Sequence, residues 1–308
     1  MRVKILGSAA GGGFPQWNCA CQNCAGVRAG RFSGKARSQA QVAVSQDGEC
    51  WFLLGASPDL RSQIEGFPEL HPREGLRQSP IAGVLLASAD LDHVLGLLLM
   101  RELQPLRVYG TASVLRILRQ NSMFGMLNRV ANQVVWSEIS VGREFCAMSA
   151  SNVSSGLKCR AVALGTRYPS YMRAANGVQA DPSEALLGLI VESQSGAKLA
   201  YMPAVPEITD NLLEELESAA LVFFDGTFWS DDELIKVQGE GETARQMGHV
   251  PVGSGEGTLR KLAGLRRPRK IFLHINNTNP MLNESGPEFK AVREAGWEVA
   301  EDGWQFEL

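Results

Sequence analysis

Three cysteines lie within six residues near the start of the chain, at Cys19, Cys21 and Cys24. A tetrahedral zinc ion takes thiolate ligands at about 2.3 Å, and thiolates this close in sequence supply them with little loop-closure entropy. We therefore expect a structural zinc site here. Two alternatives stay open, namely a cluster of buried thiols that bind nothing and a redox Cys-x-x-Cys pair at a helix start.

The zinc site needs one more ligand, because structural zinc sites have four protein ligands as a rule. The candidates are His249 and a residue beside His274 such as Asn277. Spacing in the sequence does not choose between them. The remaining cysteines lie in strand-like surroundings and are expected to be inert buried thiols: Cys50, Cys146 and Cys159.

A second group with chemical potential is Asp90, Asp92 and His93, which follow an apolar run and precede another. Side chains at the carboxyl end of a buried strand, just before a helix, project into one crevice. Carboxylate and imidazole ligands suit a divalent metal such as Zn²⁺, Fe²⁺ or Mn²⁺. The alternative is structural: the aspartates cap the helix and His93 packs in its first turn.

Three further residues favour the interpretation of this segment as part of a metal site. Asp225 and His274 each end a short apolar run, and His249 follows a glycine. Any one of them alone is more often structural. Together with the Asp90–His93 segment they favour a working metal site at the ends of several strands.

The elements that must position these residues alternate between strand and helix patterns. We expect a buried strand over Ile81–Ala87, a packed helix over His93–Leu103 and a surface loop over Gly165–Ser183. No composition break marks a boundary, so a single domain over 1–308 is expected. An α/β fold of two mixed sheets with helices outside, an αββα sandwich, fits this order, and a doubly wound sheet stays open.

Composition narrows the class of protein. The 308 residues are 44% hydrophobic and 20% charged, with a formal net charge of −3. No basic block stands out, so no nucleic acid partner is expected. The apolar runs are too short for a membrane span, and Met1–Gly7 reads as a strand rather than a signal peptide. We expect a cytoplasmic protein with thiols rather than disulfides.

The sequence resembles a known superfamily at these positions. The segment from Ser88 to His93 occupies the place of the His-x-His-x-Asp-His signature of the metallo-β-lactamase superfamily. The strings Gly7–Cys19, Met247–Pro251 and His274–Pro280 closely resemble the pyrroloquinoline quinone (PQQ) biosynthesis protein B family, and the similarity runs to the C-terminus. This resemblance implies a metallo-β-lactamase-like αββα fold. A related phosphodiesterase has a histidine at the place of Asn277, which makes Asn277 the tentative fourth zinc ligand.

The positions at which this sequence differs from the superfamily signature indicate which chemistry the site supports. Two signature histidines are replaced by Ser88 and Asp90, and the metal-bridging aspartate would fall near Met202–Ala204, where no ligand exists. Asp92, His93 and His274 remain, with Asp90 as a further candidate. Two histidines and a carboxylate with open positions are the ligand set of non-haem Fe(II) oxygenases. Two-metal hydrolysis is therefore disfavoured.

Two functions follow from the resemblance. The first is an iron-dependent hydroxylase that adds oxygen to the tyrosine ring of a Glu-Tyr-derived PQQ precursor, with His249 as acid or base and Asp225 orienting it. The second is a carrier that assists transport of PQQ or its precursor to the periplasm. Arg167 and Tyr171, with Tyr168 between them, would bind the cofactor there, although an ordinary loop explains them too. Contacts with other PQQ-pathway proteins and a homodimer stay open.

Overall fold

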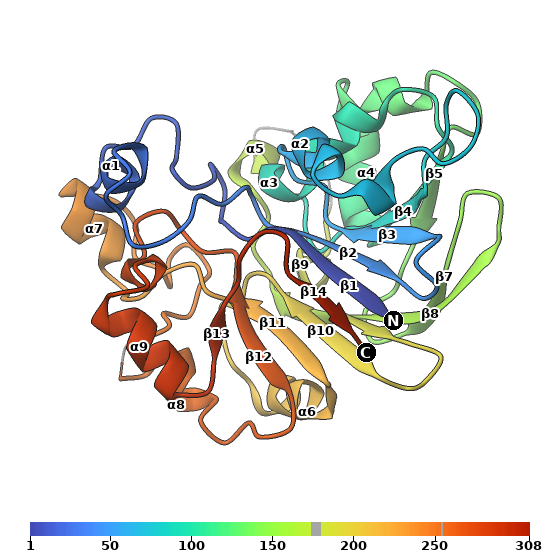
Figure 1. Cartoon of the computed structure of the whole chain (residues 1–308). Helices are drawn as coiled ribbons and strands as arrows, with labels where there is room; N and C mark the ends of the chain where they lie inside the picture. The colour runs from blue at the N-terminus through green and yellow to red at the C-terminus, as the bar shows by residue number, and fades with distance from the viewer. Residues whose placement is uncertain (174–179, 254) are drawn as a thin grey trace. The chain divides into compact units, whose positions relative to one another are not determined.

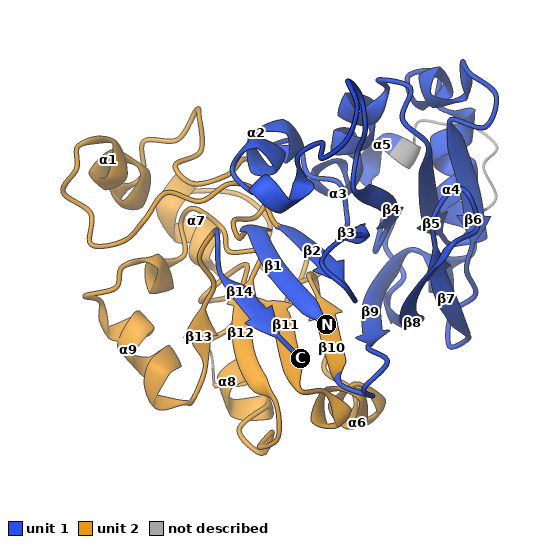
Figure 2. Ribbon diagram, turned by 45° about the vertical axis from the view of Figure 1, so that its right-hand side comes forward, with its two compact units in different colours: residues 1–6, 41–197, 303–308 blue, residues 7–40, 198–302 orange. Residues whose placement is uncertain are grey.

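The computed structural model describes residues 1–173, 180–253 and 255–308. The chain forms two compact units, each built from separated stretches of sequence (Figure 2). Unit 1 comprises residues 1–6, 41–197 and 303–308, and unit 2 comprises residues 7–40 and 198–302. The single domain expected over 1–308 stays a prediction.

Unit 1 contains a mixed sheet with the strand order β14-β1-β2-β3-β4-β5-β6 (Figure 1). Neighbours are antiparallel at β14–β1 and β2–β3 and parallel from β3 to β6. The strands are β1 Arg2–Gly7, β2 Gln41–Ser45, β3 Trp51–Leu54, β4 Ile81–Leu85, β5 Leu106–Gly110, β6 Val134–Glu138 and β14 Gln305–Glu307.

The second sheet is also mixed. Its antiparallel strands belong to unit 1: β7 Glu144–Met148, β8 Ser154–Gly165 and β9 Leu186–Glu192. Its parallel strands belong to unit 2: β10 Lys198–Met202, β11 Leu221–Asp225, β12 Arg269–Leu273 and β13 Glu298–Val299. The two mixed sheets expected from the sequence are thereby confirmed.

The helices are short. Those of unit 1 are α2 Leu60–Glu65, α3 Leu91–Val94, α4 Ala112–Gln120 and α5 Ser170–Arg173, with 3₁₀ turns at Pro68–Leu70, Leu95–Met100, Phe124–Asn128 and Pro182–Glu184. Those of unit 2 are α1 Gln22–Arg28, α6 Asp210–Ser218, α7 Glu233–Gln238, α8 Thr258–Lys261 and α9 Pro287–Glu294, with a 3₁₀ turn at Pro280–Leu282. No helix among the described residues is both long enough and apolar enough to cross a bilayer.

Each unit has its own aromatic core. In unit 1 the buried Trp51 on β3 meets Phe67 edge to face, with ring centroids 5.1 Å apart. In unit 2 the ring of Trp297 stacks on Phe272 of β12 at 4.3 Å. Both strands are buried along most of their length, which explains their continuous apolar sequence.

The helix predicted after β4 is wrong in its length and type. The expected helix over His93–Leu103 is a four-residue α-helix followed by the 3₁₀ turn Leu95–Met100. The cause is a close approach at Gly96, where an added Cβ would lie 2.4 Å from the Ser57 carbonyl oxygen. The backbone must therefore pass the neighbouring loop at a glycine, and the regular helix ends there. The predicted strand Ile81–Ala87 is confirmed but ends at Leu85.

The expected surface loop Gly165–Ser183 is described only in part. Residues 174–179 lie outside the described residues, and the rest includes α5 and the 3₁₀ turn Pro182–Glu184.

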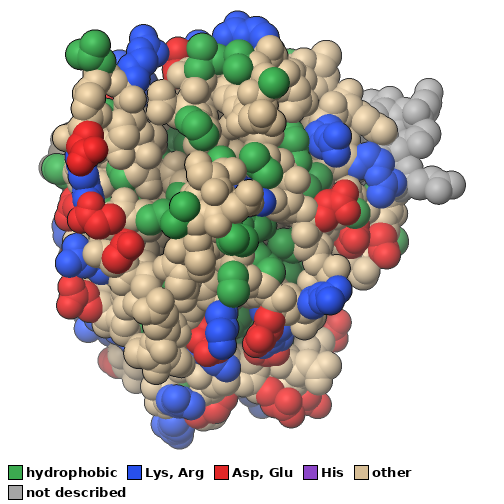
Figure 3. Space-filling view, turned by 90° about the vertical axis from the view of Figure 1, so that its right-hand side faces the viewer, with side chains coloured by type: hydrophobic (Ala, Val, Ile, Leu, Met, Phe, Trp, Pro, Cys, Tyr) green, Lys and Arg blue, Asp and Glu red, His purple; other side chains and the backbone are tan. Residues whose placement is uncertain are grey.

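On the face drawn in Figure 3, Lys and Arg side chains lie among Asp and Glu side chains, with hydrophobic groups between them. The expectation of no nucleic acid partner stays a prediction.

Candidate functional site

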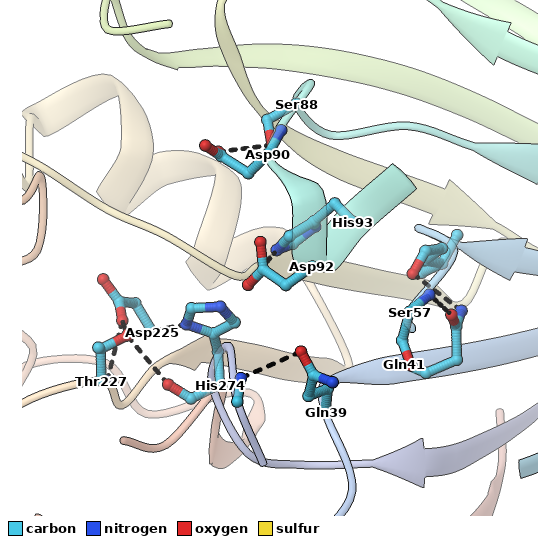
Figure 4. A network of polar contacts seen from close by, with 12 residues as sticks. Gln39, Gln41, Ser57, Ser88, Asp90, Asp92, His93, Asp225, Thr227 and His274 are labelled. Atoms are coloured by element: carbon cyan, nitrogen blue, oxygen red, sulfur yellow. Dashed lines mark hydrogen bonds and ion pairs between the residues drawn. The ribbon is translucent and has the colours of Figure 1, made fainter. Parts of the chain in front are cut away.

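The loop after β4 carries the candidate ligands of unit 1. The Ser88 hydroxyl donates to the Asp90 carboxylate at 2.8 Å, and the Asp90 N–H donates back to the Ser88 oxygen at 3.1 Å (Figure 4). Asp90 is the N-cap residue of α3, although its side chain makes no capping bond. Ser88 and Asp90 thus hydrogen-bond to each other. They stand at two positions where the superfamily signature has histidines.

His93 is fixed by its own backbone. Its carbonyl accepts from the Ala56 N–H at 2.7 Å, and the Ala56 carbonyl accepts from the Gly96 N–H at 2.9 Å. The loop containing Ala56 is held in turn by the buried Gln41, whose amide oxygen accepts from the Ser57 N–H at 2.8 Å (Figure 4). His93 is buried, and its Nε2 lies 3.8 Å from an Asp92 carboxylate oxygen. The two candidate ligands therefore lie next to each other on α3.

The candidate acid–base residues of unit 2 surround Asp225, the last residue of β11. Its buried carboxylate accepts from the Val205 N–H at 2.9 Å, from the Thr227 N–H at 3.0 Å and from the Thr227 hydroxyl at 2.6 Å. Burial alone would raise the pKa of Asp225. The charge and hydrogen bond of His249, with smaller contributions from His274 and Thr227, outweigh burial and hold that pKa below its usual value.

The Asp225 carboxylate orients His249 directly, and Thr227, which donates to that carboxylate, contacts the ring of His274. His249 Nδ1 lies 2.8 Å from Asp225 Oδ2, so the other nitrogen, Nε2, is the one left for proton transfer. His274 Nδ1 lies 2.9 Å from the Thr227 hydroxyl. The imidazole rings of His249 and His274 stack with their centroids 5.8 Å apart. His274 has a φ of 57°, a strained value for a residue with a Cβ. Strain of this kind persists where surrounding contacts over-determine the conformation.

The cysteine cluster of unit 2 has the chemistry of a metal site. The three sulfurs lie within 4.8 Å of one another. Burial raises the pKa of Cys24 to about 11, whereas hydrogen bonds from Cys21, Cys24 and Asn277 overcome burial at Cys19 and lower its pKa. The three thiols cannot all ionise together without a nearby cation, and a divalent metal supplies that charge. The donor set therefore fits zinc.

Asn277 is the residue that the structure brings to these sulfurs. Its Nδ2 lies 3.2 Å from Cys19 Sγ, 3.7 Å from Cys21 Sγ and 3.3 Å from Cys24 Sγ. His249, the other candidate fourth ligand, is bonded to Asp225 instead. Of the two candidates left open by the sequence, the geometry therefore favours Asn277.

The remaining predicted site residues divide between the units. The proposed triad takes Asp92 and His93 from unit 1 and His274 from unit 2, so it stays a prediction. In unit 1, Arg167 is exposed. Tyr168 and Tyr171 pack against the apolar core, and their hydroxyls donate to the backbone carbonyls of Asp181 and Ala89. Tyr171 thereby holds the loop that carries Asp90.

Sequence reasoning missed three polar residues of these sites. Gln41 supports the His93 loop, and Thr227 links Asp225 to His274. The third is Glu233, whose buried carboxyl accepts from the Thr278 hydroxyl and from the Trp229 N–H at 2.6 Å, and whose pKa burial raises to about 7. The Asp-x-Thr spacing after an apolar strand was the only available signal, and it pointed to Thr227.

Comparison with known proteins places these features in a family. A model of the beta-lactamase superfamily domain matches residues 50–275. Coenzyme PQQ synthesis protein B of Bradyrhizobium diazoefficiens is 42% identical over 100% of both chains, and that of Gluconobacter oxydans is 42% identical over 99% of this chain and 98% of its own. The crystal structure of Zn²⁺-bound PqqB from Methylobacterium extorquens covers 100% of both chains with a TM-score of 0.91 and 39% identity. A diphosphatase of the PhnP family, at 19% identity and a TM-score of 0.65, shares the fold.

Proposed function

This chain belongs to the coenzyme PQQ synthesis protein B family of the beta-lactamase superfamily, and from that premise we propose that it acts in PQQ biosynthesis. The metallo-β-lactamase-like fold expected from the sequence is confirmed by the same comparisons. A zinc-bound relative and the Cys19–Cys21–Cys24 group support a bound divalent metal. We assign zinc to these cysteines, because thiolates suit it.

The reaction that we propose is iron-dependent hydroxylation of the tyrosine ring of a Glu-Tyr-derived precursor. The observation that carries it is the Ser88–Asp90 hydrogen bond, which occupies two positions where a two-metal hydrolase would place imidazoles. Without those ligands, the paired ions that activate water and clamp a leaving group are not supported. Asp92, His93 and His274 would hold a single Fe²⁺, which in such a ligand set supplies activation of O₂.

The chain's own residues have three roles in this proposal. Thr227 bonds Nδ1 of His274, so Nε2 is the nitrogen that would bind the metal. The Asp225 carboxylate holds Nδ1 of His249, so Nε2 is the atom at which His249 would take up or release a proton. The contacts of Gln41 and Tyr171 keep the loops around His93 and Asp90 in place.

The test is an assay with protein reconstituted anaerobically with Fe²⁺. A Glu-Tyr peptide, a reductant and isotope-labelled O₂ are added, and mass spectrometry follows the labelled oxygen. We expect labelled product from the wild type and none from His274→Ala. Glu298→Gln, a change at an Arg269-paired carboxylate of unit 2, is the matched control and should retain activity. Product formation by metal-free protein would refute the oxygenase.

The transport role is the second candidate. The exposed Arg167 supports it, since a guanidinium can pair with the carboxylates of PQQ. Calorimetry with finished PQQ separates the two roles. Tight binding of PQQ that Arg167→Ala weakens, in a protein that makes no labelled product, would favour the carrier.

A further inference from the structure

The amide of Asn277 covers the three cysteine sulfurs of unit 2. Its Nδ2 lies between 3.2 and 3.7 Å from each sulfur, so it sits over the sulfur triangle rather than beside one thiol. This is where the fourth ligand of a tetrahedral zinc ion belongs. Asn277 is buried, and its backbone carbonyl accepts from Asn23 Nδ2 at 3.1 Å. The backbone of Asn277 is therefore held at this position by a residue of α1.

An asparagine amide is a weak zinc ligand. Its N–H groups face the sulfurs in the structure, and they donate to thiolates. An amide nitrogen of this kind does not bind metals, so coordination needs the carbonyl oxygen turned toward the metal by rotation of the amide. That oxygen is neutral and hard, whereas the other three ligands are soft thiolates. Zinc with three thiolates and an amide oxygen therefore has one ligand that other donors can replace.

The site is also open on one side. A cavity of about 410 Å³ adjoins the cluster, and its lining includes Cys19, Cys21 and Asn277 together with the side-chain amides of Gln16, Asn18 and Gln238. Zinc sites closed by four protein ligands are structural, while sites that bind outside ligands keep one position accessible. Among the described residues the lining has no charged side chain and combines polar residues with Ala20 and Val237, so it can accommodate a small donor molecule beside the sulfurs. The cavity that admits a small molecule and the weak fourth ligand therefore lie at the same side of the zinc site.

The local charge permits an anionic donor. Three thiolates on Zn²⁺ give a net charge of −1, and a fourth thiolate makes it −2. Arg28, the last residue of α1, donates to the carbonyls of Gln16 and Cys19, which places a positive charge at the loop that carries the cluster. That charge offsets part of the added negative charge.

We propose that the zinc held by Cys19, Cys21 and Cys24 has an exchangeable fourth position, at which a small thiolate entering from this cavity replaces the Asn277 amide. In the exchange a thiol releases its proton to solvent, the sulfur–zinc bond forms, and the amide oxygen leaves. No electron is transferred. The inference rests on the zinc assignment made above and is independent of the oxygenase chemistry.

The test uses one equivalent of Co²⁺ in place of zinc, because sulfur-to-cobalt charge-transfer bands present before thiol is added show that the metal occupies the cysteine site. Ethanethiol is titrated into the wild type, Asn277→His and Asn277→Ala. We expect a saturable spectral change in the wild type and in Asn277→Ala. Asn277→His, whose imidazole closes the site, should show none. Zinc transfer from Asn277→His to a chromophoric chelator should be at least about tenfold slower than from the wild type, the lower end of the cost of altering a metal's surroundings.

Two results would overturn the proposal. One is a wild-type cobalt spectrum that saturating ethanethiol leaves unchanged, and the other is equal zinc release from the wild type and Asn277→His. If Asn277→His does not fold, the wild type and Asn277→Ala still decide the question. Protein that binds Co²⁺ without charge-transfer bands would refute the zinc assignment itself. Failure of the hydroxylation assay would change none of these spectra.

Discussion

Substitution of Glu233 by glutamine should stabilise the protein at high pH and have little effect at low pH. The buried carboxyl accepts from Thr278 and from the Trp229 N–H, and burial raises its pKa from 4.5 to about 7. Between these two values the folded state binds more protons than the unfolded chain. The free energy of unfolding of the wild type therefore falls as the pH rises through this window. Glutamine cannot ionise, so the variant lacks this loss.

The magnitude follows from the two pKa values. Each pH unit of difference corresponds to about 1.4 kcal/mol, so ionisation of Glu233 costs the folded state about 3 kcal/mol above pH 7. The assay is urea unfolding of both proteins at about pH 5 and about pH 8, with zinc held constant. The difference between the two proteins should grow by about 2.5 kcal/mol between these conditions, because the carboxyl of the unfolded chain is already mostly ionised at pH 5. A difference that stays equal at the two pH values would refute the assignment of the raised pKa to Glu233.

The control for this experiment is Glu298→Gln. A hydrogen bond from Arg269 outweighs burial and lowers the pKa of Glu298. Its ionised form therefore stabilises the fold above pH 4.5, and that contribution is lost as the pH falls through the lowered pKa. Loss of this carboxylate should destabilise the protein at high pH, which is the opposite sign to Glu233→Gln.

Three further predictions concern the candidate sites. Asp225→Asn should reduce turnover by about 100-fold, because His249 loses the carboxylate that orients its ring. Steady-state kinetics of labelled product formation would measure this. Removal of zinc by a chelator should lower the unfolding free energy by about 2.7 kcal/mol relative to protein kept at a zinc concentration 100-fold above Kd, whereas Cys24→Ser should be insensitive to the chelator. Tyr171→Phe should cost about 1 kcal/mol in urea unfolding, since its hydroxyl donates to the Ala89 carbonyl. An unchanged free energy of unfolding would show that this hydrogen bond does not stabilise unit 1.

The strands could be predicted from the sequence because their apolar runs are buried along most of their length. The apolar runs that end at Asp225 and His274 form most of β11 and β12. The helix over His93–Leu103 was wrong because the constraint on Gly96 comes from Ser57, which lies far away in sequence. Local periodicity contains no information about that contact.

The site residues also divide into those that a local sequence pattern reveals and those that only the fold brings together. A cysteine cluster within six residues is visible as a local pattern, and strand-end positions identified Asp225 and His274. The fourth residue at the sulfurs is far from the cluster in sequence, so spacing left Asn277 and His249 both open. The resemblance pointed to Asn277, and the geometry favours it. Glu233 escaped notice because a glutamate in a polar stretch is normally solvated, and only its burial against Thr278 changes its chemistry.

The pairing of β1 with β14 has a consequence for synthesis of the chain. Arg2, Val3 and Lys4 pair with Glu307, Phe306 and Gln305, and the Met1 amino group donates to the Leu308 carbonyl. The ribosome makes β1 before the rest of unit 1 and all of unit 2, and it makes β14 after them. One edge of β1 must therefore wait, with unsatisfied backbone donors and acceptors, until translation has passed residue 305. Loss of β14 would leave that edge open permanently, so chains without β14 are the forms most exposed to intermolecular strand pairing.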